Sequence, residues 1–123
     1  MKFVALLLIA LILFCIFAPF GILATIVLIF IKDSREQFSK LSDYPYGIAH
    51  SIDILGNVVC GDLFNVTMIK HGGYRFGVRT ETISSALGKN QLEGTLTSIG
   101  NIVANLLDAI DKNHCVKSIQ EIK

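Results

Sequence analysis

The chain lacks tryptophan and is poor in proline, cysteine and charge. Its 123 residues include two prolines and three cysteines, and charged residues make up 17% of the sequence. The formal net charge of +1 at pH 7 leaves no basic excess for a nucleic-acid surface. The cysteines, Cys15, Cys60 and Cys115, are an odd and sparse set. The composition therefore argues against nucleic-acid binding and against a disulfide framework, and it suits free thiols in a reducing compartment.

Charge is missing above all from the start of the chain. The 29 residues from Phe3 to Ile31 carry no charged side chain. A run of about 18 apolar residues is already long enough to cross the ~30 Å hydrocarbon core of a bilayer. The sequence therefore predicts a single N-terminal transmembrane helix over residues 1–31, with the lipid bilayer as its partner.

The run also lacks the features of a cleaved export signal. A secretory signal has an apolar core of about 7–15 residues that ends in small residues of the A-x-A kind, and no A-x-A occurs at the end of this run. Cys15 follows Leu13 and Phe14, which are not the small residues that precede a lipoprotein cysteine. We therefore expect an uncleaved anchor.

The length and flanks of the run bear on its topology. As one helix it would be about 43 Å long, which exceeds the hydrocarbon thickness. One span, tilted or bent at Pro19, is favoured over a hairpin, because the arm after Pro19 is too short to cross back. One basic residue, Lys2, precedes the run, and three follow it closely: Lys32, Arg35 and Lys40. This excess of basic residues after the run favours a cytoplasmic C-terminal domain.

The rest of the chain is expected to form a juxtamembrane segment and one small domain. Residues 32–41 are polar and suit a short helical continuation, and a turn around Pro45 and Gly47 is expected to end it. The segment with its turn covers residues 32–46, and the domain covers residues 47–123. The periodicities of the domain are helical, so we expect an all-α fold: one transmembrane helix followed by a small helical domain.

Two segments of the domain have the three- and four-residue spacing of an amphipathic helix. Gly47–Ile69 is expected to lie on the membrane surface or in the domain core, and its apolar stripe is Ile48, Ile52, Leu55, Val59, Leu63 and Val66. Thr95–Asp111 is the clearest soluble helix. Its predicted inner stripe is Leu96, Ile99, Val103, Leu106 and Ile110.

The remaining elements are short. Residues 70–77 contain three glycines and predict a loop. A helix over residues 80–89 is expected to be capped by Thr80 or Thr82 and stopped by Gly88. A last helix over residues 114–122 would follow Asn113 as its cap, with an inner face of Val116, Ile119 and Ile122.

Only a few cysteines and histidines suggest chemistry. Cys60, His71, His114 and Cys115 are of the types that bind zinc, but their spacing matches no zinc-finger pattern and the last two are adjacent. Cys60 followed by His114 also has the chain order of some thiol hydrolases. Core cysteines and surface histidines are the ordinary explanation of these residues.

Ser85 and Lys89 are the other pair worth noting. They are four residues apart, unlike the S-x-x-K pattern of serine acyltransferases, and are expected to face solvent on a helix. We therefore assign no catalytic, cofactor-binding or metal-binding residue from the sequence, and no cofactor.

Several short motifs occur in order between Ser51 and Ile119: Leu55-Gly56-Asn57, Cys60-Gly61-Asp62, Glu81-Thr82-Ile83-Ser84-Ser85, Gly88-Lys89 and His114-Cys115. This order resembles a family of small, mostly uncharacterised phage and prophage proteins, many of which have a hydrophobic N-terminal segment. The chain departs from the family pattern at Arg79-Thr80, where the family tends to have Pro-Asp. The resemblance implies bacteriophage origin and a bacterial inner membrane, and it implies no activity.

Two hypotheses of function follow. The first is a membrane-anchored, non-enzymatic phage protein that binds itself or a host or phage membrane protein, in lysis control, superinfection exclusion or genome delivery. The alternative is a small membrane-tethered hydrolase or metal-binding protein that uses Cys60, His114 and Cys115.

Overall fold

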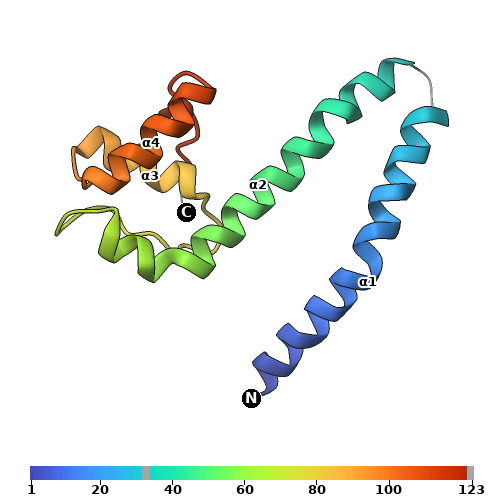
Figure 1. Cartoon of the computed structure of the whole chain (residues 1–123), viewed down its shortest axis with the longest axis horizontal. Coiled ribbons are helices and arrows are strands. Elements are labelled where there is room, and N and C mark those ends of the chain that lie inside the picture. Colours follow the sequence, from blue (N-terminus) through green and yellow to red (C-terminus); the bar gives the residue numbers. More distant parts are fainter. Residues whose placement is uncertain (32–33, 122–123) are drawn as a thin grey trace. The chain divides into compact units, whose positions relative to one another are not determined.

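The computed structural model describes residues 1–31 and 34–121, with side chains outside residues 34–42. Every helix or strand element assigned to the described residues is an α-helix, which confirms the all-α prediction. The chain divides into two compact units, Met1–Pro45 and Tyr46–Lys123, and each is considered by itself (Figure 1). What was predicted for residues 32–33 and 122–123 lies outside the described residues.

The first helix is long and apolar, as predicted. Helix α1 runs from Lys2 to Ile31 and continues through Pro19, so the chain does not turn back at this residue. None of its residues is buried. It is the one helix in the described part of the chain that is long and apolar enough to cross a membrane.

Helix α2 spans Ser34–Thr67, and the turn predicted around Pro45 and Gly47 is wrong. Proline inside a helix removes a single backbone hydrogen bond and crowds the preceding turn. The 34-residue helix has regular turns on both sides of Pro45, and they hold it in helical geometry. The 3.6-residue period expected after Gly47 is present within α2.

The unit that begins at Tyr46 is built around helix α3, Ile83–Glu93, which packs against α4, Ser98–Ile110, and α5, His114–Lys117. The loop predicted at residues 70–77 contains no helix, and an isolated antiparallel bridge pairs Ile69, just before it, with Leu96. The buried apolar core of this unit is small: Met68, Ile69, Phe76, Ala86, Leu87, Leu96, Ala104 and Cys115.

The ends of α3 follow their capping residues. Thr82 is the N-cap, as predicted, and its hydroxyl accepts the Ser85 N–H at 3.0 Å. The predicted stop at Gly88 is wrong, because Gly94 ends the helix in the left-handed conformation (φ 68°). Gly88 serves packing instead: a Cβ there would overlap the carbonyl oxygen of Cys115.

The inner faces predicted for the two last helices are confirmed only in part: Leu96 lies in the core and Val103 packs against it. In α4 the buried residues are Gly100 and Ala104, whereas Ile99, Leu106 and Ile110 are exposed. The predicted stripe is therefore displaced around the helix, because a glycine and an alanine allow α4 to approach its neighbours closely.

Helix α5 ends at Lys117, well before residue 122. Asn113 is its N-cap residue but makes no side-chain capping bond. Val116 is exposed rather than turned inward.

The close approach at Gly88 gives a stability prediction. Replacing Gly88 with alanine should lower the free energy of unfolding by about 1–3 kcal/mol, because a rigid backbone carbonyl occupies the space of the new methyl group. Urea unfolding of the full chain in mild detergent, followed by circular dichroism, measures this loss.

Gly47→Ala is the matched control for this experiment. Gly47 also lies in a helix, and a Cβ there meets nothing within 4 Å. The control should leave stability unchanged or raise it by up to about 1 kcal/mol. Equal stability of the two variants would contradict the packing described for Gly88.

Candidate functional site

The cysteines and histidines that suggested chemistry differ in exposure. Cys115 is fully buried, and Cys60 is partly buried. His71 is exposed, and the half-buried His114 lies 3.2 Å from the carboxylate of Asp111. Among the described residues, no three or more His, Cys, Asp or Glu side chains are grouped so that they could hold a metal ion.

Cys115 is in a poor environment for a nucleophile. Burial, together with the nearby carboxylate of Asp108, raises the pKa of its thiol to about 12. The Sγ atom lies 3.9 Å from the carbonyl oxygen of Ala104. A thiol held in this way stays protonated at neutral pH, and the thiolate is the reactive form.

Ser85 and Lys89 do act together, but around a buried carboxylate. Glu81 is fully buried and four residues before Ser85, which is also fully buried and donates to Glu81 Oε1 at 2.7 Å. Lys89 Nζ lies 2.5 Å from the same oxygen. Tyr74 donates its hydroxyl proton to Glu81 Oε2 at 2.7 Å. The expectation that Ser85 faces solvent is therefore wrong.

The pKa values of Tyr74 and Lys89 in this cluster differ from their ordinary values. Burial and the hydrogen bond to Glu81 raise the pKa of Tyr74 above its ordinary value. Burial works to lower the pKa of Lys89, but the hydrogen bonds and charges of Glu81 and Tyr74 outweigh it and raise this pKa. The ammonium also lies 4.3 Å from the centre of the Tyr74 ring, which adds a cation–π contact.

This cluster is better suited to structure than to catalysis. The Ser85 hydroxyl gives its proton to Glu81 and accepts the N–H of Gln120 at 2.8 Å, so both its donor and one acceptor position are used inside the protein. The 81-85-89 spacing was the sequence signal for it, because residues four apart share a helix face and Glu81 lies just before α3.

Asparagine side chains of α2 and α3 hold the glycine-rich loop. Asn57 is fully buried, donates to the carbonyl of Glu81 at 2.8 Å and accepts the Gly77 N–H at 3.0 Å. Asn90 accepts the Tyr74 N–H at 2.9 Å and donates to its carbonyl at 2.8 Å. These bonds replace the backbone ladder that the loop lacks.

Asp53 fixes the start of α3. Its two carboxylate oxygens accept the Ile83 N–H at 2.9 Å and the Ser84 hydroxyl at 2.8 Å. A carboxylate at a helix N-terminus is also favoured by the helix dipole. The polar side of α2, with Asp53 and Asn57, is therefore the side that faces the rest of the unit.

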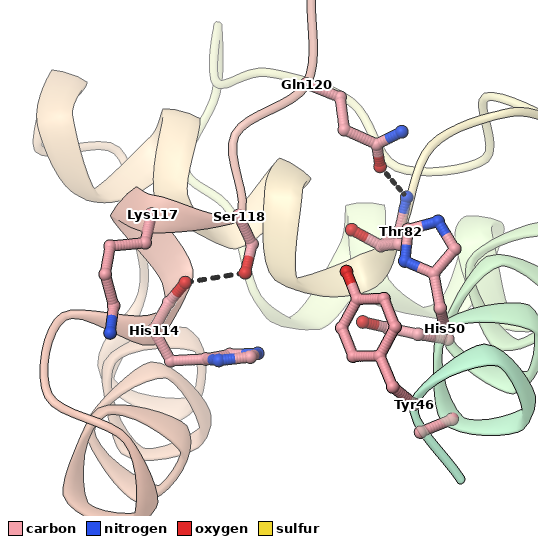
Figure 2. Close-up of a pocket in the computed structure, with 9 residues that line it drawn as sticks. Tyr46, His50, Thr82, His114, Lys117, Ser118 and Gln120 are labelled. Atoms are coloured by element: carbon pink, nitrogen blue, oxygen red, sulfur yellow. Dashed lines mark hydrogen bonds between the residues drawn. The ribbon is translucent and has the colours of Figure 1, made fainter. Parts of the chain in front are cut away.

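A polar pocket of about 320 Å³ lies on the same side of α2. Figure 2 shows His114 facing Tyr46 and His50 across it. The charged groups along its wall already have partners: Asp53 caps α3, and Lys117 lies 2.7 Å from Asp111. The lining offers hydrogen-bonding groups. The sequence contains no signal for this pocket, because its lining residues His50 and His114 are far apart in the chain.

The opposite side of α2 is apolar and exposed. The six residues of its predicted stripe are 42% to 81% exposed: Ile48, Ile52, Leu55, Val59, Leu63 and Val66. Fully burying one such side chain contributes about 1.5–3 kcal/mol. A contiguous exposed face of this kind marks an interaction surface.

A groove of about 630 Å³ connects this stripe with α4. Ile52 and Phe64 line it from α2, and Val103 and Leu107 line it from α4. Helix α4 buries Gly100 and Ala104. Its solvent-exposed side carries four apolar residues: Ile99, Ile102, Leu106 and Ile110. The two helices thus form apolar rims of one groove.

Comparison with protein-family models, curated proteins and solved structures gave no match for this chain.

The buried ion pair gives a second prediction. Lys89→Met should lower the free energy of unfolding by about 3 kcal/mol, because it leaves the carboxylate of Glu81 buried without its counter-charge. The double variant Glu81→Gln/Lys89→Met removes both charges and should lose less than Lys89→Met alone. Urea titration of the full chain in mild detergent measures both.

A pH series provides an independent reading of the same pair. The folded pKa of Lys89 lies above its unfolded value, so its stabilising effect is complete below about pH 10 and is lost as pH rises through the folded pKa. The wild-type chain should therefore lose stability more steeply above this pH than the double variant. A double variant that is less stable than Lys89→Met would contradict the buried pair.

Proposed function

We propose that the chain is a membrane-anchored accessory protein that acts by binding, with α1 as its anchor and the unit from Tyr46 onward as its binding domain. The observation that carries this proposal is α1 itself. It is 30 residues long, has no buried residue and has no charged side chain between Phe3 and Ile31. Such a helix is stable in lipid.

The polar groups of α1 are compatible with lipid. A spanning helix must satisfy its backbone donors and acceptors internally, because no water is present in the hydrocarbon core. The hydroxyl of Thr25 follows the same rule by donating to the carbonyl of Gly21 at 2.9 Å. The proline at position 19 is of a kind that spanning helices tolerate.

Binding rather than catalysis is the activity we propose for the second unit. Ser85, Lys89 and Cys115 have internal partners, whereas large apolar side chains of this unit are exposed in two stripes along a groove. Exposed apolar surface is what an interaction protein offers to a partner.

The biological setting is proposed from the sequence motifs. Their resemblance to phage proteins supports viral origin, an inner-membrane location and a role in lysis control, superinfection exclusion or genome delivery. The basic residues after α1 support a cytoplasmic second unit. Candidate protein partners are a second copy or a host or phage membrane protein.

Anchoring gives a third prediction. The full chain should stay in the membrane pellet after an alkaline carbonate wash, because the wash removes peripheral proteins but leaves spanning helices in lipid. Intact mass should equal the 13.5 kDa of all 123 residues, since an uncleaved anchor keeps residues 1–31.

Two controls sharpen this experiment. A variant with Leu7, Ile12 and Ile16 changed to lysine keeps the length of α1 but should leave the pellet, because charges at the centre of a span are costly. A wild-type chain that is found in the supernatant, or in the membrane without residues 1–31, would contradict the anchor.

A further inference from the structure

We propose that the polar pocket beside Tyr46 and the apolar groove between α2 and α4 are the two ends of one binding site, and that its ligand is a single-chain amphiphile with an uncharged, hydroxyl-bearing head. This inference rests on the proposed function, because it names a ligand for the domain that is proposed to bind. The outer face of α2, with Val59 and Val66, takes no part in this site.

The pocket and the groove adjoin each other. Ala49, Asp53 and His114 line both of them, so the two depressions meet at these residues. All the lining residues belong to the unit that begins at Tyr46. A ligand that lies across the junction therefore contacts polar groups at one end and apolar side chains at the other. Sites for small molecules combine the same features, because a few polar groups orient a ligand that is held mainly by an apolar lining.

The polar end has hydrogen-bonding atoms without a partner. In the part of the chain that the structure describes, the Tyr46 hydroxyl, the His50 ring and Nε2 of His114 form no hydrogen bond. Tyr46 and His50 stack with their ring centroids 5.8 Å apart, and His114 faces them across the pocket (Figure 2). A phenol and a neutral imidazole each offer a donor and an acceptor, which together match a hydroxyl group.

The charges of the polar end favour an uncharged head. Apart from the two histidines, its lining holds one acidic and one basic residue, Asp53 and Lys117. Both have partners within the unit, since Asp53 accepts the Ile83 N–H and Lys117 lies 2.7 Å from Asp111. A head with a net charge of either sign would meet a side chain of the same sign and would lose hydration on entering the pocket. A hydroxyl-bearing head avoids both costs.

The apolar end suits an aliphatic chain. Ile52, Phe64, Val103 and Leu107 line it from two helices, and its volume is about 630 Å³. Sites for small molecules have volumes of about 300–1,000 Å³. Each methylene group that leaves water for such a groove adds to the affinity, whereas the groove offers a polar head few hydrogen-bonding groups. The polarity of the site therefore fixes the direction of the ligand, with its head at His114 and its chain toward α4.

Photolabelling of the full chain in phosphatidylcholine nanodiscs tests the site. The probe is monodecanoylglycerol with a diazirine in its acyl chain, and mass spectrometry of peptides locates the label. We expect label on Val103 or Leu107 that saturates with probe concentration and is displaced by excess unlabelled monodecanoylglycerol. Decyl sulfate and decyltrimethylammonium carry the same alkyl chain with a negative or a positive head. Each should displace the probe about tenfold less well, because its charge is not matched in the pocket.

Matched variants test the two ends separately. Leu107→Gln alters the groove, and Leu106→Gln is its control, because Leu106 is 63% exposed and lies outside the groove lining. His114→Ala alters the pocket, and His71→Ala is its control, because His71 is exposed and lies outside the pocket lining. L107Q and H114A should each need about tenfold more probe for half-maximal label on Val103, and both controls should match the wild type. Circular dichroism verifies the fold of each variant, and H114A decides the test if L107Q loses helicity.

Three outcomes would overturn the proposal. Label on residues 3–31 that rises in proportion to the probe, with none in the groove, retains the α1 anchor and refutes the site. Saturable groove label that all three competitors displace equally well refutes the uncharged head. Groove label that appears only when each nanodisc holds a single chain assigns the groove to a second copy. Absence of label on residues 3–31 contradicts the anchor, and the groove label then decides the site by itself.

Discussion

The arrangement of the second unit depends on the polar side of α2. Asn57 is fully buried. Its side-chain amide donates a hydrogen bond to the carbonyl of Glu81 and accepts one from the N–H of Gly77, while Asp53 caps α3. A buried amide or carboxylate without these partners would cost more than the bonds return. The two residues therefore fix which side of α2 faces the domain, and the apolar side is left facing outward.

As a result, polar side chains such as Asn57 and Glu81 are buried in this unit, and many large apolar side chains are exposed. The domain is held together by a small apolar core and by a network around Glu81, in which Tyr74, Ser85 and Lys89 converge on one carboxylate. Large apolar side chains of α2 and α4 remain outside. An exposed apolar surface of this kind promotes association in water and marks an interaction surface.

Local features of the structure could be predicted from the sequence. The charge-free run predicts α1, the spacing of Ile48 to Val66 predicts the stripe of α2, and Thr82 caps α3 as expected. Each of these depends on neighbouring residues alone. Gly88 was assigned the wrong role, because its function is to admit the backbone of Cys115 from 27 residues away.

The direction of each helix face could not be predicted in the same way. Amphipathic patterns were taken to point their apolar side inward, and in α4 this placed Ile99 and Leu106 in the core, although both are exposed. The bonds that decide the direction of α2 join Asn57 to residues 20 and 24 positions later. Such pairings leave no periodic signal, so the polar pocket beside Tyr46 was missed as well.

The central claim is that α1 lies in lipid. Labelling the unmodified chain in vesicles with a photoactivatable phospholipid, followed by mass spectrometry of its peptides, tests this claim most directly. The account predicts label on residues 3–31, with none on Asn57 or Ser85, which are fully buried in the second unit. Absence of label on residues 3–31 would contradict the anchor.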